Sequence, residues 1–113
     1  MDRAKEDRMF ARVTQFDVDT VAISLDAALA RFRELILPEL KRQPGYAGSS
    51  LMRTAAGKGV LITYWTTPEA AQAGVESGFY ARQIEKFLTF YRQPPGREHY
   101  EVVFMEQPVL TEA

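Results

Sequence analysis

The sequence predicts an α+β domain whose elements follow the order β-α-β-β-α-β. Four segments read as strands from their β-branched and aromatic content or their alternation, and two segments repeat apolar residues at helical spacing. The stretch ITYWTTPEAAQAG, Ile62 to Gly74, changes from the first pattern to the second at its midpoint. A length of 113 residues is that of one ordinary domain with a single core.

The first half of the chain reads as a strand followed by a helix. Met9 to Val18 is rich in β-branched and aromatic residues, as strands are. Ser24 is a suitable N-cap for a helix, whose apolar residues recur at helical spacing: Leu25, Leu29, Phe32, Leu35 and Ile36. Pro38 lacks an amide proton and is expected to kink or end this helix, before the turn at Gln43 to Tyr46.

The middle of the chain predicts a β-hairpin. Two strand-like runs, AGSSLMRTAA and GVLITYWT, are separated by Gly57 and Lys58. Gly57 and Gly59 are expected to supply the positive φ angles that a tight turn needs. The two strands should therefore pair in antiparallel fashion.

The last third predicts a second helix and a fourth strand. Thr67 is a natural N-cap and Pro68 suits the first helical position, while Gly74 and Gly78 weaken the helix before it restarts. Its later apolar residues are Phe79, Ile84, Phe87, Leu88 and Tyr91. From Arg97 to Gln107, apolar residues alternate with polar ones, as in a strand with one face on the core.

This order is the ferredoxin-like plan, with four antiparallel strands and both helices on one side. We expect a charged, disordered extension at 1–8, a single domain at 9–107 and a C-terminal tail at 108–113. Both faces of the predicted third and fourth strands are substantially apolar. Because the helices cover one face only, a second subunit or a ligand is expected to cover the other.

Composition excludes several classes of function. Apolar residues make up 46% and charged residues 26%, with a net charge of -1, so no strong field favours nucleic acid or anionic lipid. The absence of cysteine excludes disulfides, thiol nucleophiles and iron–sulfur clusters. The first residues, MDRAKEDR, do not resemble a signal peptide, and no apolar run is long enough for a membrane span, so we expect a cytoplasmic protein.

From about Met9 to Gln107, the chain resembles the antibiotic biosynthesis monooxygenase-like group of the dimeric α/β-barrel superfamily. Three segments carry the resemblance, namely PGYAGSSLMR, VLITYWTTPEAAQA and YEVVFME. The resemblance implies a homodimer that pairs two ferredoxin-like sheets through their helix-free faces into a barrel, with an apolar cavity in each subunit. It also implies a cofactor-independent monooxygenase, with no metal, that oxidises a phenol-like, quinol-like or polyketide aromatic. Such a substrate supplies its own electrons to oxygen, so the protein binds it, deprotonates it and excludes water.

The resemblance suggests which residues form the site. Trp65 matches a tryptophan that orients the substrate ring. Tyr80 and Arg82 follow the helix break at Gly78, so they are expected to project toward Trp65 and to handle the developing charge. The other candidates for substrate binding are Gln15, Leu61, Thr63, Arg53 and Met105. Four of these residues have a structural alternative: Trp65 as a core or interface anchor, Tyr80 as a packing partner of Phe79, Arg82 as a partner of Glu76 or Glu85, and Arg53 as an ion-pair partner on the sheet.

The sequence also departs from the group. Leu61 and Ala71 stand where the cofactor-free oxygenases have an asparagine and an aromatic residue, and the asparagine and histidine of heme-degrading relatives are missing. A non-catalytic homodimer that binds a small molecule or acts as a scaffold is therefore the alternative. RNA binding is disfavoured, since Val60 and Ile62 occupy the positions where RNA-recognition domains stack aromatic rings. His99, the only histidine, is expected at a solvated or edge position.

Overall fold

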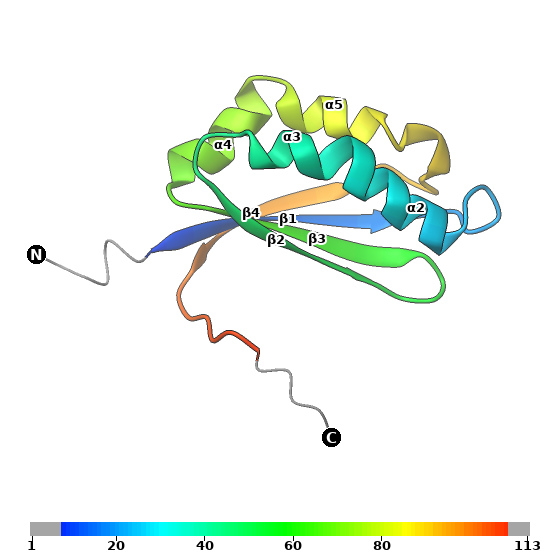
Figure 1. Ribbon diagram of the computed structural model, residues 1–113, viewed down its shortest axis with the longest axis horizontal. Helices are drawn as coiled ribbons and strands as arrows, with labels where there is room; N and C mark the ends of the chain where they lie inside the picture. Colours follow the sequence, from blue (N-terminus) through cyan, green and yellow to red (C-terminus); the bar gives the residue numbers. More distant parts are fainter. Residues whose placement is uncertain (1–7, 109–113) are drawn as a thin grey trace, which may run out of the picture.

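A computed structural model describes residues 8–108, which form one antiparallel sheet covered by helices on one side (Figure 1). The strands are β1 (Met9–Asp17), β2 (Tyr46–Arg53), β3 (Lys58–Trp65) and β4 (Gly96–Val102). They lie in the order β2-β3-β1-β4, so β1 and β3 are central and the other two are edges. The predicted ferredoxin-like α+β fold is confirmed.

The strand register decides which residues face the helices. Arg12 pairs with Thr63 of β3 on one side and with His99 of β4 on the other, and all three point to the helical side. Phe10 pairs with Trp65, and Thr14 pairs with Leu61, which continues this row along the sheet. The row therefore places charged and polar side chains between the sheet and the helices.

The first helical arm consists of α2 (Leu25–Arg31), the π-helical turn η1 (Phe32–Ile36) and α3 (Leu37–Lys41). The predicted cap is confirmed, since Ser24 Oγ accepts the Ala27 N–H at 3.1 Å. Pro38 lies in the first turn of α3 and does not end the arm. Instead the preceding turn widens, with the Leu37 N–H bonding to the Phe32 carbonyl, which relieves the clash of the Pro38 ring with the turn before it.

The second arm consists of α4 (Pro68–Glu76), α5 (Phe79–Glu85) and the 3-10 turn η2 (Leu88–Phe90). Thr67 caps α4 through a hydrogen bond of 3.0 Å to the Ala70 N–H, as predicted. Gly78 has a φ of 84°, in the left-handed region that suits glycine, and separates the two helices. The predicted break and restart of this helix are confirmed.

The hairpin between β2 and β3 is confirmed, but one glycine was assigned the wrong role. Gly57 has a φ of 98° and makes the turn, whereas Gly59 is not among the residues with positive φ. Gly59 lies opposite Phe16 in the sheet, and a Cβ there would collide with the Phe16 ring and lie 2.7 Å from the Met52 carbonyl oxygen. Close packing of an aromatic ring, and not the turn, requires glycine at this position.

The fourth strand is shorter than predicted. It ends at Val102, and residues 103–108 are not part of the sheet, so the expected strand to Gln107 is wrong in its second half. Phe104 and Met105 therefore do not extend the alternating rows, and Phe104 is 81% exposed. The helix-facing residues of β4 are Arg97, His99 and Glu101, so this row is charged and not apolar. Within residues 8–108, the apolar pattern after Val102 has no partner strand to pair with.

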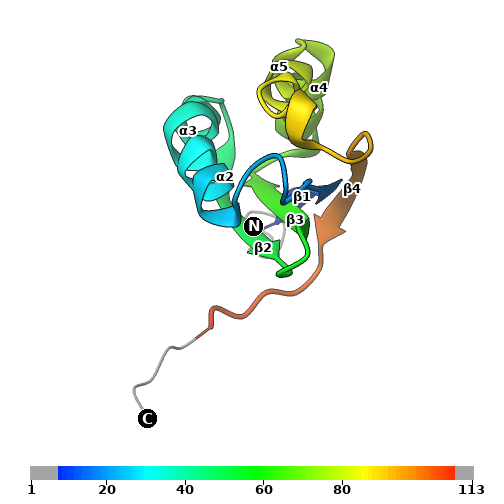
Figure 2. The ribbon, with the colours of Figure 1, turned by 90° about the vertical axis from the view of Figure 1, so that its right-hand side faces the viewer.

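The main core lies between the sheet and the two arms. It contains Trp65, which is fully buried, and five further buried residues: Ile36, Leu40, Ala71, Phe79 and Phe87. Both arms stand on the same side of the sheet, and the opposite face carries no helix (Figure 2). That face presents an apolar row with side chains from all four strands, including Val13, Met52, Ile62 and Tyr100, and it also carries the polar residues Gln15, Ser50 and Glu98. Met52 and Tyr100 are 52% and 53% exposed, so this row is open in the single chain.

Most of the extension at 1–8 and of the tail at 108–113 lies outside the described residues. Among the helices of residues 8–108, none combines the length and apolar character needed to cross a membrane.

We predict that Gly59→Ala destabilises the protein by about 1–3 kcal/mol, because the added methyl group overpacks the space occupied by Phe16. Gly96→Ala is the matched control, since a Cβ there meets only Gln15 Oε1 at 3.9 Å. Urea unfolding of both variants measures the effect. Equal stability of the two variants would contradict the close-packing explanation.

Candidate functional site

A cavity of about 460 Å³ lies between the sheet and the two helical arms. The arms stand apart above the sheet (Figure 2), and side chains from both of them, together with β1, β2 and β3, line the space. A volume of this size is in the range of small-molecule sites. The cavity is therefore the candidate site.

Most of the cavity wall is apolar and aromatic. Ring faces come from Phe32 on the first arm and from Phe87 and Tyr91 on the second, with aliphatic side chains between them. Phe87 and Tyr91 stack with their centroids 6.2 Å apart. Burial raises the pKa of Tyr91 to about 12, so its hydroxyl keeps its proton at neutral pH. Such walls suit a planar apolar ligand.

Arg12 of β1 is the charged residue at the floor of the cavity. Its side chain is 2% exposed, and its guanidinium carbon lies 5.0 Å from the Trp65 ring centroid and 4.9 Å from that of Tyr80. One Nη donates to the Ala71 carbonyl at 3.1 Å. Gly74 makes room for this group, since a Cβ there would lie 3.2 Å from the nearer Nη. Burial lowers the pKa of Arg12 to about 10, which still leaves it charged at neutral pH.

Tyr80 of α5 faces Arg12 across the cavity floor. Its hydroxyl lies 3.1 Å from Thr14 Oγ1, and either oxygen can donate. A second guanidinium, that of Arg97 on β4, lies 5.1 Å from the same ring. Burial and the neighbouring Arg12 and Arg97 lower the pKa of His99, so its imidazole is neutral at neutral pH. The arrangement joins a hydroxyl pair to two positive charges beside an apolar space.

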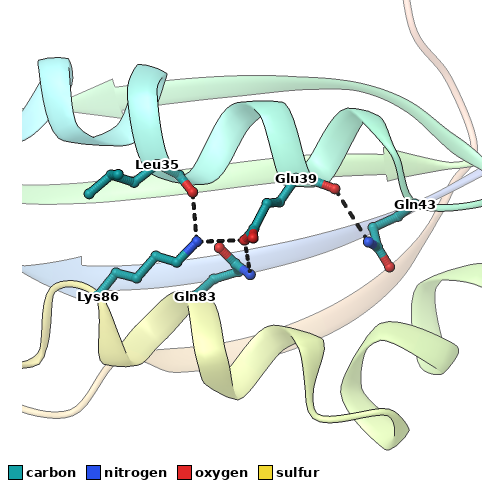
Figure 3. Close-up of polar contacts among 5 residues, drawn as sticks. All are labelled: Leu35, Glu39, Gln43, Gln83 and Lys86. Atoms are coloured by element: carbon teal, nitrogen blue, oxygen red, sulfur yellow. Dashed lines mark hydrogen bonds and ion pairs between the residues drawn. The ribbon is translucent and has the colours of Figure 1, made fainter.

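A polar bridge joins the two arms above the sheet (Figure 3). Glu39 of α3 accepts hydrogen bonds from Gln83 Nε2 at 2.8 Å and from Lys86 Nζ, and Lys86 also donates to the Leu35 carbonyl at 2.6 Å. Gln83 lines the cavity, and its Oε1 is buried without a hydrogen-bond partner among the described residues. The bridge holds the arms together across the cavity.

The cavity brings together Tyr80, Leu61, Thr63 and Arg53 of the predicted site residues. Arg53 also donates to the Leu25 carbonyl at 2.7 Å and pairs with Asp26 at 3.4 Å, as its structural alternative proposed. Thr63 Oγ1 accepts the indole N–H of Trp65 at 2.9 Å.

The other predicted site residues lie outside the cavity lining. Trp65 is fully buried in the core, beneath Arg12, and Arg82 is exposed on α5. Gln15 is exposed on the helix-free face of β1, and Met105 lies beyond β4, where its sulfur accepts a hydrogen bond from Gln107. His99 is exposed on the edge strand β4, where a solvated or edge position was expected.

Sequence reasoning missed Arg12, Thr14 and Gln83. One signal was present: Arg12 and Thr14 interrupt the face of a strand on which Phe10 and Phe16 are apolar. A charged residue within an otherwise apolar strand face indicates either an edge position or a function. In the structure β1 is central in the sheet, and this excludes an edge position. The sequence alone does not show that β1 is central.

No group of three His, Cys, Asp or Glu side chains within residues 8–108 is placed to hold a metal ion. No family model matches the chain, and no curated protein matches its sequence.

Several solved structures share the fold. An antibiotic biosynthesis monooxygenase is 19% identical, with a TM-score of 0.64 over 83% of this chain and 98% of its own. A monooxygenase from the gene ActVA-Orf6 of Streptomyces coelicolor, in complex with nanaomycin D, is 15% identical, with a TM-score of 0.67 over 88% and 92%. SnoaB, a cofactor-independent oxygenase from Streptomyces nogalater, is 20% identical, with a TM-score of 0.57 over 92% and 98%. The predicted resemblance is confirmed at the level of the fold.

We predict that Glu39→Gln destabilises the protein at neutral pH more than at acidic pH. The hydrogen bonds from Lys86 and Gln83 lower the pKa of Glu39 below its ordinary value of 4.5. A lowered folded-state pKa contributes stability above pH 4.5, and this contribution disappears as the pH falls through the folded-state value.

Urea unfolding at pH 7 and pH 3.5 measures this difference, with Glu85→Gln, on the exposed side of α5, as the control. The stability gap between native protein and Glu39→Gln should narrow at the lower pH. A gap of the same size at both pH values would show that the carboxylate charge is not what stabilises the bridge.

Proposed function

We propose that the protein is a monooxygenase that oxidises a small electron-rich aromatic molecule in the cavity, without an added cofactor. The observation that carries the proposal is the hydroxyl pair of Tyr80 and Thr14 at the floor of an apolar cavity, with two guanidinium groups beside the Tyr80 ring. Structures with the same fold include a monooxygenase and a cofactor-independent oxygenase, which agrees with this reaction class.

The chemistry requires a phenol to become a phenolate. Tyr80 relays the phenol proton through the Thr14 hydroxyl towards water, and the positive charges of Arg12 and Arg97 favour the anion. The phenolate then donates electrons to dioxygen and forms a carbon–oxygen bond. Loss of water from the resulting hydroperoxide leaves a quinone carbonyl, so one dioxygen is consumed and one water is released per substrate.

In this proposal the aromatic walls hold the ring and Trp65 acts through Arg12. The indole lies beneath the guanidinium and fixes its position, which makes Trp65 a positioning residue. Thr63 orients the indole in turn, through the hydrogen bond to its N–H. Arg82 was expected to stabilise charge, but Arg12 has the buried position that this role requires.

We predict that the purified protein oxidises 1,8-dihydroxyanthrone to 1,8-dihydroxyanthraquinone in the presence of a chelator and without flavin. An oxygen electrode should record one dioxygen per quinone above the uncatalysed rate. Tyr80→Phe should lower kcat/KM by about 100-fold, because it removes the proton relay. Arg42→Met, at an exposed position on the end of α3, is the control and should keep the native rate. A rate no higher than the background would favour the non-catalytic alternative.

We also propose that two copies of the chain pair through the helix-free face of the sheet. The apolar row on this face, with Met52 and Tyr100 half exposed, is the kind of surface that a partner covers. A second sheet laid on it would bury the row on both copies and form the barrel that the resemblance implies.

We predict that Ile62→Lys converts a dimer into a monomer, because it places a charge at the centre of this apolar row. Light scattering coupled to size exclusion should show the mass of two chains for the native protein and of one chain for the variant. Val21→Lys is the control, since Val21 is 93% exposed between β1 and α2. A native protein with the mass of one chain at micromolar concentration would rule out this interface.

A further inference from the structure

Arg12 is a buried cation that has no carboxylate partner among the described residues. The ion pairs within residues 8–108 are Arg8–Glu101, Arg53–Asp26, Lys86–Glu39 and the pairs of Arg92 with Asp17 and Asp19. All of these involve groups more exposed than Arg12, which is 2% exposed. Arg12 is therefore less accessible than every cation of these ion pairs, yet it has no counter-ion among residues 8–108.

Burying a guanidinium without an anion is unfavourable. The cost of removing a charge from water is several kcal/mol, and the contacts of Arg12 offset only part of it. These contacts are one hydrogen bond to the Ala71 carbonyl and the faces of the Trp65 and Tyr80 rings. A methionine would fill the same space without this cost. The charge of Arg12 is therefore expected to act on a molecule bound in the cavity.

The surroundings of Arg12 add positive charge and no negative charge close by. Its neighbour on β4 is His99, which is neutral at pH 7, and Arg97 lies two residues further along the same row. The nearest acid of that row, Glu101, lies opposite Phe10 and pairs with Arg8. The floor of the cavity is therefore electropositive, while its walls are mostly apolar and aromatic, with Arg33 and Arg53 also among the lining residues.

We infer that the cavity binds a planar aromatic carboxylate, with the carboxylate on the Arg12 guanidinium and the ring between the aromatic walls. A carboxylate is ionised before it enters, whereas an ordinary phenol is neutral at pH 7 and brings no charge to Arg12. The fork of a guanidinium also matches the two oxygens of a carboxylate. This inference uses the cavity of the proposed function as its ligand site, but it does not depend on the oxygenation step.

The hydroxyl pair and Arg12 together define the substrate class more narrowly. Tyr80 contacts both the guanidinium and Thr14, so a ring whose carboxylate binds Arg12 can present a neighbouring hydroxyl to Tyr80. The preferred substrate of the proposed reaction is then a hydroxyaryl carboxylate, which binds more tightly than a neutral phenol.

The test measures, by calorimetric titration in the absence of oxygen, the affinity of the protein for 3-hydroxy-2-naphthoate, its methyl ester and decanoate. The native protein should bind the acid about 30-fold more tightly than the ester, because only the acid pairs with Arg12. Arg12→Met should bind the acid about 30-fold more weakly than the native protein does. Its affinity for the ester should be unchanged, which would show that the cavity is intact. Arg12→Lys should recover part of the loss, and Arg42→Met should bind as the native protein does.

Three results would overturn the inference: equal affinity of the native protein for acid and ester, acid binding that survives Arg12→Met, or decanoate binding as tight as that of the naphthoate. Tight binding of decanoate would indicate that the ligand is a fatty acid and not an aromatic acid. If Arg12→Met fails to fold, Arg12→Lys and the ratio of acid to ester affinity in the native protein still test whether Arg12 binds the carboxylate. Tight binding of the acid without any oxygen uptake would contradict the proposed monooxygenase alone, and oxidation of the anthrone without acid preference would contradict this inference alone.

Discussion

The guanidinium of Arg12, held between the rings of Trp65 and Tyr80, connects the core of this protein to its cavity. Trp65 ends the central strand β3 and is fully buried, while Tyr80 belongs to the helix that restarts after Gly78. Arg12 bridges these two elements and bonds to the Ala71 carbonyl of α4. One side chain therefore ties the sheet to both helices of the second arm, and its charge remains at the edge of the open space.

The two helical arms make that space possible. Each arm packs on the sheet through its own apolar residues, and the arms meet through the bridge of Glu39, Gln83 and Lys86. If apolar contacts alone joined the arms, they would close on one another and fill the space with side chains. A polar bridge above an apolar cavity holds them at a distance, and hydrogen-bond geometry sets that distance.

Only part of the site follows from the pattern of residue types. Leu61, Thr63 and Tyr80 were placed in the site from the alternation of β3 and the helix break at Gly78, and they line the cavity. Gln15 and Arg82 are polar residues near these elements but lie outside the cavity lining. Gln15 follows Thr14 in a strand, where one residue of shift turns a side chain to the other face. Arg82 lies two residues after Tyr80 in α5, which turns its side chain about 200° around the helix. Met105 was placed by extending an alternating pattern past the last residue that has a strand to pair with.

The sequence by itself determined the order of the elements, the caps at Ser24 and Thr67 and the break at Gly78. These features depend on local backbone preferences and on side-chain period, which neighbouring residues decide. The tertiary structure decided that β1 is central, that Arg12 is buried between two rings and that Trp65 lies beneath it and not in the cavity. Those facts depend on pairings between residues far apart in the chain, and no local pattern records which strands become neighbours.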